Sequence, residues 1–419
     1  MKKALIVASG LRDVSGHNCF YTRAVQRELE RRGLAVTVFA NKSLSATLSK
    51  DDSFVPVFSL GTYDLAPGNG PWSDLFFIYH ESAIYRYELQ SAMQKHSSDF
   101  DLIFCHTVSD FELIAWKSFL RRNRLRGHLF ILERSTPRFH SCKRWKLLVH
   151  PYWRMKPHYL NAIYRKMRGR FTLLTDSDIL TEDYARIYKH RIVTMPIPIE
   201  TPAHQAEHNI PAESVISRYN LRNNGYVSFG YLGDSRPAKG FVLLPDMVQQ
   251  VLEKDVKLKF IIQCLSNEYE SWRVPEAYEA FQNLQRLSEK HSDRLILVKE
   301  KLSEEDYARL FNFIDVLLLP YTDPNFMEGT SNIFAEALAL GKPMVVPKET
   351  WMSRELKESD CGTTFQRGNV DEFTDKVFQL YEGYENYSSK AQSFRDKWNE
   401  FHNPKTLVDI ILRESRLEN

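Results

Sequence analysis

Two glutamates, Glu328 and Glu336, lie on either side of a predicted helix start. The residues between them that favour a helix start or a close backbone approach are Gly329, Thr330, Ser331 and Asn332. Backbone amides in the first turn of a helix lack partners within the helix and bind anions. Carboxylates accept hydrogen bonds from hydroxyl groups. An anion site between two carboxylates therefore suits a phosphate with a sugar attached.

Two short apolar runs position this helix. Residues 316–320 and 343–347 have the length and composition of buried strands, which predicts two parallel strands joined by the helix. Ligands of such sheets bind at the carboxyl ends of the strands. We therefore expect Glu328, in the loop after the first strand, at the ligand-binding edge.

A glycine-rich loop at residues 230–240 also follows a predicted strand and contains Gly233, Arg236 and Lys239. Arginine binds phosphate oxygens as a fork, and lysine binds them as a point charge. The two cations are either phosphate ligands or solvated surface charges. The first interpretation is favoured because this loop and the loop before Glu336 are predicted to lie at the same sheet edge.

The first half of the chain has the same strand, loop and helix pattern. Its first loop contains Gly16 and His17, which either line a ligand or only form a turn, and its glycine spacing is not that of a dinucleotide-binding loop. His106 ends a buried strand and is either a site residue or a structural histidine. The Asp176-Ser177-Asp178 stretch is either a metal-binding signature or, as we favour, the cap of the following helix.

Composition fits a two-domain α/β protein. The chain has 419 residues, of which 43% are hydrophobic and 26% charged. Five scattered cysteines form no CxxC pair, which argues against a zinc site or disulfide framework and fits a reducing cytoplasm. The apolar run at the start is too short for a signal peptide, and no run has the length of a membrane span.

Positive charge is concentrated in residues 117–170. This segment has sixteen lysine and arginine residues and a single acid, Glu133, although the net charge of the chain is only +3. Within it, residues 157–170 have the pattern of a basic amphipathic helix. The segment is a membrane-facing patch that serves a lipid-linked acceptor, a groove for an anionic glycan acceptor, or a solvated or internally paired face. No nucleic-acid-binding module is recognisable.

Several stretches together resemble the retaining glycosyltransferases of the GT-B fold, specifically the family 4-like "group 1" enzymes of bacterial polysaccharide synthesis. The matching stretches are Glu328, Gly329 and Glu336 with the following EALALGKPMVV, FGYLGDSRPAKGF, His106 and the N-terminal glycine loop. The resemblance extends over residues 1 to about 370. It implies two Rossmann-like doubly wound domains that face each other across a cleft.

The resemblance also implies roles for individual residues. Glu336 would bind ribose hydroxyls of the donor, Glu328 would contact the transferred sugar, and His106 would touch the sugar or the acceptor. The diphosphate would be held by Arg236, Lys239 and amides of residues 329–332, with Gly16 and Gly233 lining the donor site. Residues near Lys301 and Leu302 would meet the base. Many relatives have an arginine directly after the glycine at position 230, where this chain has Tyr231.

The sequence thus predicts three segments. Residues 1–205 form an acceptor-binding domain and residues 222–385 a nucleotide-sugar-binding domain, while helices in 386–419 pack back on the first domain. The implied function is retaining transfer of a hexose-type sugar from a UDP- or GDP-linked donor to a glycan or lipid-linked acceptor in surface polysaccharide or glycoconjugate synthesis. No metal or other cofactor is expected. Alternatives are a nucleotide-sugar epimerase of the same fold and an inactive nucleotide- or glycan-binding scaffold. The expected location is the cytoplasm or the inner face of the cell membrane.

Overall fold

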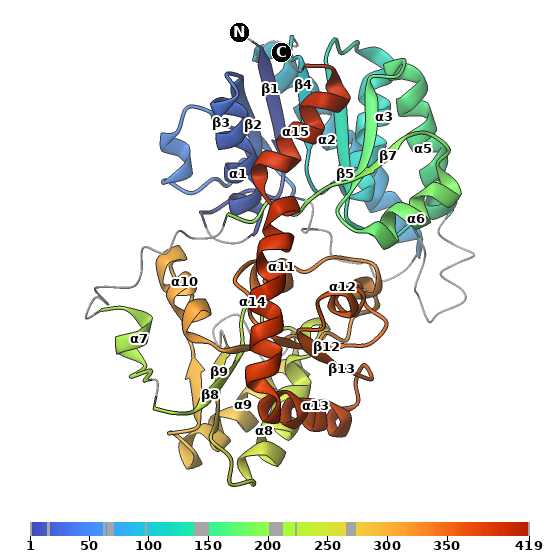
Figure 1. Ribbon diagram of the computed structural model, residues 1–419. Coiled ribbons are helices and arrows are strands. Elements are labelled where there is room, and N and C mark those ends of the chain that lie inside the picture. Colours follow the sequence, from blue (N-terminus) through green and yellow to red (C-terminus); the bar gives the residue numbers. More distant parts are fainter. Residues whose placement is uncertain are drawn as a thin grey trace. The chain divides into compact units, whose positions relative to one another are not determined.

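Strands of nearly continuous apolar sequence form the centre of two separate units in the computed structural model (Figure 1). The structure describes residues 2–14, 17–61, 64, 71–96, 99–137, 151–200, 213–222, 224–264 and 274–417. The first unit consists of Met1–Pro198 and His402–Asn419, and the second of Ile199–Phe401. The prediction of two doubly wound α/β domains is confirmed by the parallel sheet in each unit.

Among its described residues, the first unit has a seven-stranded parallel sheet with strand order β3-β2-β1-β4-β5-β6-β7. The strands are β1 (Lys3–Ala8), β2 (Ala35–Asn41), β3 (Phe54–Phe58), β4 (Leu102–Cys105), β5 (His128–Glu133), β6 (Phe171–Thr175) and β7 (Ile192–Thr194). The helices are α1 (His17–Arg31), α2 (Pro71–Lys95), α3 (Asp110–Arg122), α5 (Pro151–Met167), α6 (Asp178–Ile187) and α15 (Pro404–Ser415). Strand β3 lies in a stretch whose many turn residues did not indicate it.

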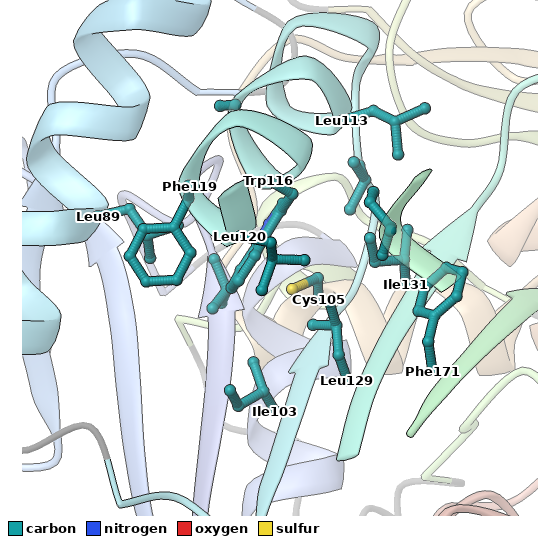
Figure 2. Packing of buried hydrophobic residues seen from close by; sticks show 14 of the residues in the cluster. Leu89, Ile103, Cys105, Leu113, Trp116, Phe119, Leu120, Leu129, Ile131 and Phe171 are labelled. Atoms are coloured by element: carbon teal, nitrogen blue, oxygen red, sulfur yellow. The ribbon is translucent and has the colours of Figure 1, made fainter. Parts of the chain in front are cut away.

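Alternate side chains of the strands point to two different cores. Leu5 and Val7 of β1 pack with α2, α3, α5 and α6, whereas Ile6 packs on the other face with α1 and α15. Figure 2 shows the first of these cores, where Trp116 and Phe119 of α3 lie over the strands. Burial of both faces explains why the strands are apolar throughout instead of alternating with polar residues.

Among its described residues, the second unit has a six-stranded parallel sheet with order β10-β9-β8-β11-β12-β13. The strands are β8 (Val227–Tyr231), β9 (Leu258–Gln263), β10 (Leu295–Val298), β11 (Val316–Leu318), β12 (Met344–Pro347) and β13 (Gly362–Phe365). The helices are α7 (Val215–Arg218), α8 (Leu244–Leu252), α9 (Pro275–Lys290), α10 (Glu304–Phe313), α11 (Asn332–Ala339), α12 (Trp351–Ser359), α13 (Val370–Glu382) and α14 (Tyr384–Phe401). None of the described helices is long and apolar enough to cross a membrane.

The two last helices belong to different units, which corrects the expectation that residues 386–419 as a whole pack on the first domain. Helix α14 stays with the second unit because Trp398 packs against Phe334 and Trp351. A new helix then begins, with the side chain of Asn403 capping α15 and Pro404 at its first position. Helix α15 completes the core on the α1 side of the first unit.

Candidate functional site

The Glu328–Glu336 stretch folds as a short 3-10 turn followed by a capped helix. The turn Pro324–Met327 ends at Glu328, whose side chain is only 4% exposed. The helix α11 begins after Ser331, whose Oγ accepts a hydrogen bond from the amide of Phe334 at 3.3 Å. Ser331 is therefore the N-cap residue, and Glu336 lies in the second turn of α11, as the sequence predicts.

Glu336 is held by a tyrosine from a different helix. The hydroxyl of Tyr307, on α10, donates a hydrogen bond to Oε2 of Glu336 at 2.8 Å. Burial raises the pKa of Glu336 to about 7, although the Tyr307 hydrogen bond and the charge of Lys239 act in the opposite direction. Near neutral pH this carboxyl group is consequently divided between its charged and neutral forms.

The loop after β8 brings its cations to the start of α11. Gly233 has a φ of +93°, and a Cβ placed on it would lie 2.8 Å from Cδ1 of Ile333 and 3.6 Å from Nζ of Lys239. Burial lowers the pKa of Lys239, and the charges of Lys239 and Glu336 stabilise each other. The side chain of Arg236 is 57% exposed, and its Nε lies 2.5 Å from Oδ2 of Asp234. The predicted meeting of the two loops at one sheet edge is thus observed within the second unit.

Two of the backbone amides expected at the phosphates already have partners. The amide of Gly329 donates to the carbonyl of Asn325 at 2.9 Å, since the 3-10 turn extends to this residue. The amide of Gly233 donates to Oε1 of Gln263 at 2.9 Å. The side chains of Arg236 and Lys239 supply positive charge at the same edge.

Gln263 also joins this edge to the loop that contains Lys301 and Leu302. The side-chain amide of Gln263 donates to the carbonyl of Glu300 at 3.5 Å, and Gln263 is itself only 6% exposed. Lys301 is exposed and Leu302 is partly buried in the loop between β10 and α10. The residues expected near the base therefore lie next to the glycine loop in the second unit.

His106 lies at the end of β4 in the first unit and is 3% exposed. Its Nε2 lies 2.7 Å from Oγ1 of Thr22, its Nδ1 lies 3.4 Å from Oγ1 of Thr107, and its ring stacks on Tyr21. Thr107 has a φ of +61°, a left-handed conformation that β-branched residues rarely adopt and that is enriched at functional sites. Gly16, the other predicted site residue of this unit, lies outside the described residues.

The Asp176-Ser177-Asp178 stretch is a helix cap, as favoured from the sequence. The side chain of Ser177 accepts from the amide of Leu180 at the start of α6. Oδ2 of Asp176 accepts a hydrogen bond from Nε of Arg134 at 2.6 Å. Within the described part of the chain, no group of three histidine, cysteine or acidic residues has the arrangement of a metal site.

Comparison with known families identifies the second unit. Residues 226–383 match the family of Glycosyl transferases group 1. The second unit therefore resembles a group 1 glycosyltransferase domain. The matched residues include the glycine loop, its two cations and both glutamates of the α11 stretch. No curated protein sequence matches the chain.

Solved structures of similar fold extend over both units. Sucrose-phosphate synthase from Thermosynechococcus elongatus is 13% identical with a TM-score of 0.67, and the match covers 100% of this chain and 98% of that one. Anabaena HepE in complex with UDP-glucose is 14% identical with a TM-score of 0.67 and full coverage of both chains (100% and 100%). An E. coli structure described as trehalose-6-phosphate bound with UDP-2-fluoro glucose is 10% identical with a TM-score of 0.71, also covering 100% of each chain. The fold is therefore the GT-B fold.

Sequence reasoning missed three residues that organise this glycosyltransferase domain. Tyr307 and Gln263 support the site as described above, and Tyr321 donates to or accepts from Oγ of Ser331 at 3.1 Å. The ring centroid of Tyr321 also lies 5.9 Å from Nζ of Lys239. Each comes from a segment distant in sequence from the residue that it supports, so spacing alone gave no signal for it.

Proposed function

We propose that this protein is a retaining, nucleotide-sugar-dependent hexosyltransferase. It transfers a sugar from a UDP- or GDP-linked donor to a glycan or lipid-linked acceptor in surface polysaccharide or glycoconjugate synthesis. The observation that carries the proposal is the packing of the Gly233–Lys239 loop against the start of α11, which brings two cations and a carboxylate together. The UDP-glucose and UDP-2-fluoro glucose named for two similar structures support a nucleotide-sugar donor.

The chemistry of sugar transfer matches these groups. Breaking the bond between a sugar and a diphosphate leaves negative charge on the diphosphate and builds positive charge on the sugar. Lys239 and Arg236 stabilise the first charge, and Glu328 stabilises the second in a site shielded from water. Lys239 is well suited to this role because its ammonium group is held in place before the reaction starts. It lies near the Tyr321 ring and is attracted to the charge of Glu336. With these cations the proposal needs no cofactor.

The configuration at the anomeric carbon of the sugar is retained if the acceptor hydroxyl attacks that carbon from the face from which the diphosphate leaves. The departing phosphate oxygen then takes the proton of that hydroxyl, so a separate side-chain base is not required. His106 is assigned to the sugar or acceptor, and Glu336 to the ribose. Buried cysteines such as Cys105 and Cys264, which form no disulfide, support a cytoplasmic location.

The test is binding and turnover across donors. We expect UDP or GDP to raise the melting temperature of the second unit, and one UDP- or GDP-sugar to be hydrolysed slowly without acceptor. The variant Lys239→Met should lose most of this stabilisation. Stabilisation by neither nucleotide would contradict the transferase and favour the scaffold alternative. Isomerisation of the donor sugar without transfer would favour the epimerase.

Donor binding is expected to weaken as the pH falls through about 7, the pKa to which burial raises Glu336. The charged form is the one that accepts hydrogen bonds from ribose hydroxyls, so affinity is highest above this pH and falls at most about tenfold per pH unit below it. The measurement is the KM for donor between about pH 5.5 and about pH 8. Glu336→Gln should bind weakly with a flat profile, and a flat wild-type profile would refute the assignment.

Replacing Tyr307 with phenylalanine is expected to raise the KM for donor about tenfold, because a hydrogen bond to a charged group is lost. The same bond lowers the pKa of Glu336, so the midpoint of the KM profile should move to higher pH. The value of kcat should change little. The control is Tyr278→Phe on α9, a partly buried tyrosine elsewhere in this unit. An unchanged KM with an unchanged midpoint would show that Tyr307 does not position Glu336.

A further inference from the structure

Exposed cations cluster where α3 and α5 of the first unit end. Those of the α3 end are Arg121, Arg122, Arg124 and Arg126, and those of the α5 end are Arg165, Lys166, Arg168 and Arg170; together they are called the basic edge. The described stretches 117–128 and 155–170 contain no acidic residue. The basic edge is therefore predominantly positive, although Arg126 pairs with the exposed Asp99 at 3.4 Å.

The fold holds the two halves of the basic edge together. The guanidinium group of Arg170 donates to the carbonyl of Leu125 at 3.0 Å and also to the carbonyl of Arg126. Strands β5 and β6, which begin directly after the two stretches, pair in parallel with Leu129 opposite Phe171. The cations are consequently neighbours in space, although 26 residues separate the two stretches.

Helix dipoles explain only part of this cluster. Cations in the last turn of a helix stabilise its negative end, which accounts for Arg121, Arg122, Arg165 and Lys166. Arg124 and Arg126 lie beyond α3, and Arg168 lies beyond α5. Arg168 even adopts a left-handed φ of +52°, which glycine or asparagine adopts at less cost. The structural role of helix ends therefore does not account for the whole surface.

The location of the basic edge does not fit an acceptor groove. His106 and Thr107 follow the carboxyl end of β4, whereas Arg126 and Arg170 precede the amino ends of β5 and β6. Because these strands are parallel, the two groups lie at opposite edges of one sheet. An anionic acceptor bound to the basic edge would be far from the residue assigned to acceptor contact.

Helix α5 is also unavailable as an inserting amphipathic helix. Its apolar residues Tyr159, Leu160 and Ile163 are buried in the core of the first unit, and Lys156 is buried in ion pairs with Glu133 and Asp110. The helix predicted over residues 157–170 is thus amphipathic, with its apolar residues turned to the core. What α5 presents outward is charge.

Aromatic side chains are exposed instead on α2, which packs against α3. Phe76 is 74% exposed, Tyr79 46% and Tyr87 72%. Their spacing of three and eleven residues places them on one side of the helix. The hydroxyl of Tyr79 lies 3.0 Å from that of Tyr159, which joins α2 to α5. Helices α2, α3 and α5 thus form one layer, with exposed aromatic rings on α2 and the basic edge where α3 and α5 end.

We propose that this helix layer binds the surface of an anionic phospholipid bilayer. The basic edge attracts the charged headgroups, and Phe76, Tyr79 and Tyr87 enter the interfacial region, where aromatic rings are favoured. Nucleic acid fits this surface less well, because Trp116, Phe119 and Tyr159, the aromatic residues beside the cations, are buried in the core and present no stacking surface. Membrane binding is independent of sugar transfer and is measured without a donor.

The experiment is flotation of the full chain with vesicles of phosphatidylcholine alone or mixed with phosphatidylglycerol. We expect binding only to the anionic vesicles, and loss of binding at high salt. The variant Arg124→Gln/Arg165→Gln/Lys166→Gln should bind about a hundredfold more weakly, since three cations are removed. The control Lys254→Gln/Lys257→Gln/Lys290→Gln removes three exposed cations from the second unit and should bind as the wild type does.

A second variant, Phe76→Ser/Tyr87→Ser, separates the aromatic contribution from the charge and should weaken binding to anionic vesicles at low salt while keeping the salt dependence of the wild type. Circular dichroism and thermal unfolding, measured on every variant, show whether the first unit is folded in each. The proposal is overturned if the wild type does not float with anionic vesicles at low salt, or if both triple variants lose binding equally. It is also overturned if the basic edge retains an RNA oligonucleotide but no vesicles.

Discussion

Replacing Glu328 with glutamine is expected to lower kcat about 10²- to 10³-fold while the affinity for UDP or GDP changes little. Glu328 is buried at the end of the 3-10 turn before α11, so its charge acts in a poorly hydrated place where it is strong. It is assigned to the transferred sugar and not to the nucleotide. The measurement is single-turnover transfer, alongside a titration with the nucleoside diphosphate.

Glutamine has the same shape but no charge, so this variant separates electrostatic stabilisation from packing. The matched control is Glu279→Gln, an exposed glutamate on α9 of the same unit, which should keep full turnover. Wild-type kcat in Glu328→Gln would remove Glu328 from the reaction. Equal loss of nucleotide binding and turnover would instead make Glu328 a general support of the donor site.

Replacing Gly240 with alanine is expected to destabilise the second unit by about 3 kcal/mol or more. Gly240 has a φ of +74°, and a Cβ there would lie 1.7 Å from the carbonyl oxygen of Pro320. That segment cannot move freely, because the amides of Thr322 and Asp323 both donate to the carbonyl of Ala238. Any shift also displaces Lys239, so the affinity for nucleotide should fall together with stability.

The matched control is Gly225→Ala. Gly225 has a similar φ of +82°, but a Cβ there would meet nothing within 4 Å. The Gly225→Ala variant should therefore be less stable only by the backbone strain, which is about 1–2 kcal/mol. The measurement is the denaturation midpoint of the second unit with and without nucleotide. If the two variants have the same midpoint, the close approach of the Gly240 and Pro320 segments is not a constraint.

Much of the fold follows from local pattern. Apolar runs such as Leu258–Gln263 are buried on both faces and are recognisable as parallel strands. Strand β3 is hidden by its turn-rich neighbours, and the division between α14 and α15 depends on the tertiary contacts of Trp398. Contacts of this kind have no periodicity that a sequence reveals.

The candidate site was likewise predictable from the sequence only in part. Glu328, Glu336, Arg236 and Lys239 stand beside predicted strand and helix ends, so their placement follows from the rule for ligands of parallel sheets. The partners of the amides were not predictable. The conformation of one short turn decides whether the amide of Gly329 points to a ligand or to the carbonyl of Asn325. Tyr307, which binds Glu336, is 29 positions away from it in the sequence.

The return of α15 to the first unit has a consequence for synthesis. Leu407, Ile411 and their neighbours on α15 complete an apolar core with β1 and α1, which precede the whole second unit in the sequence. That core stays open to water until residues 404–415 have left the ribosome, whereas every element of the second unit is by then available. The first unit is therefore the later of the two to complete its core.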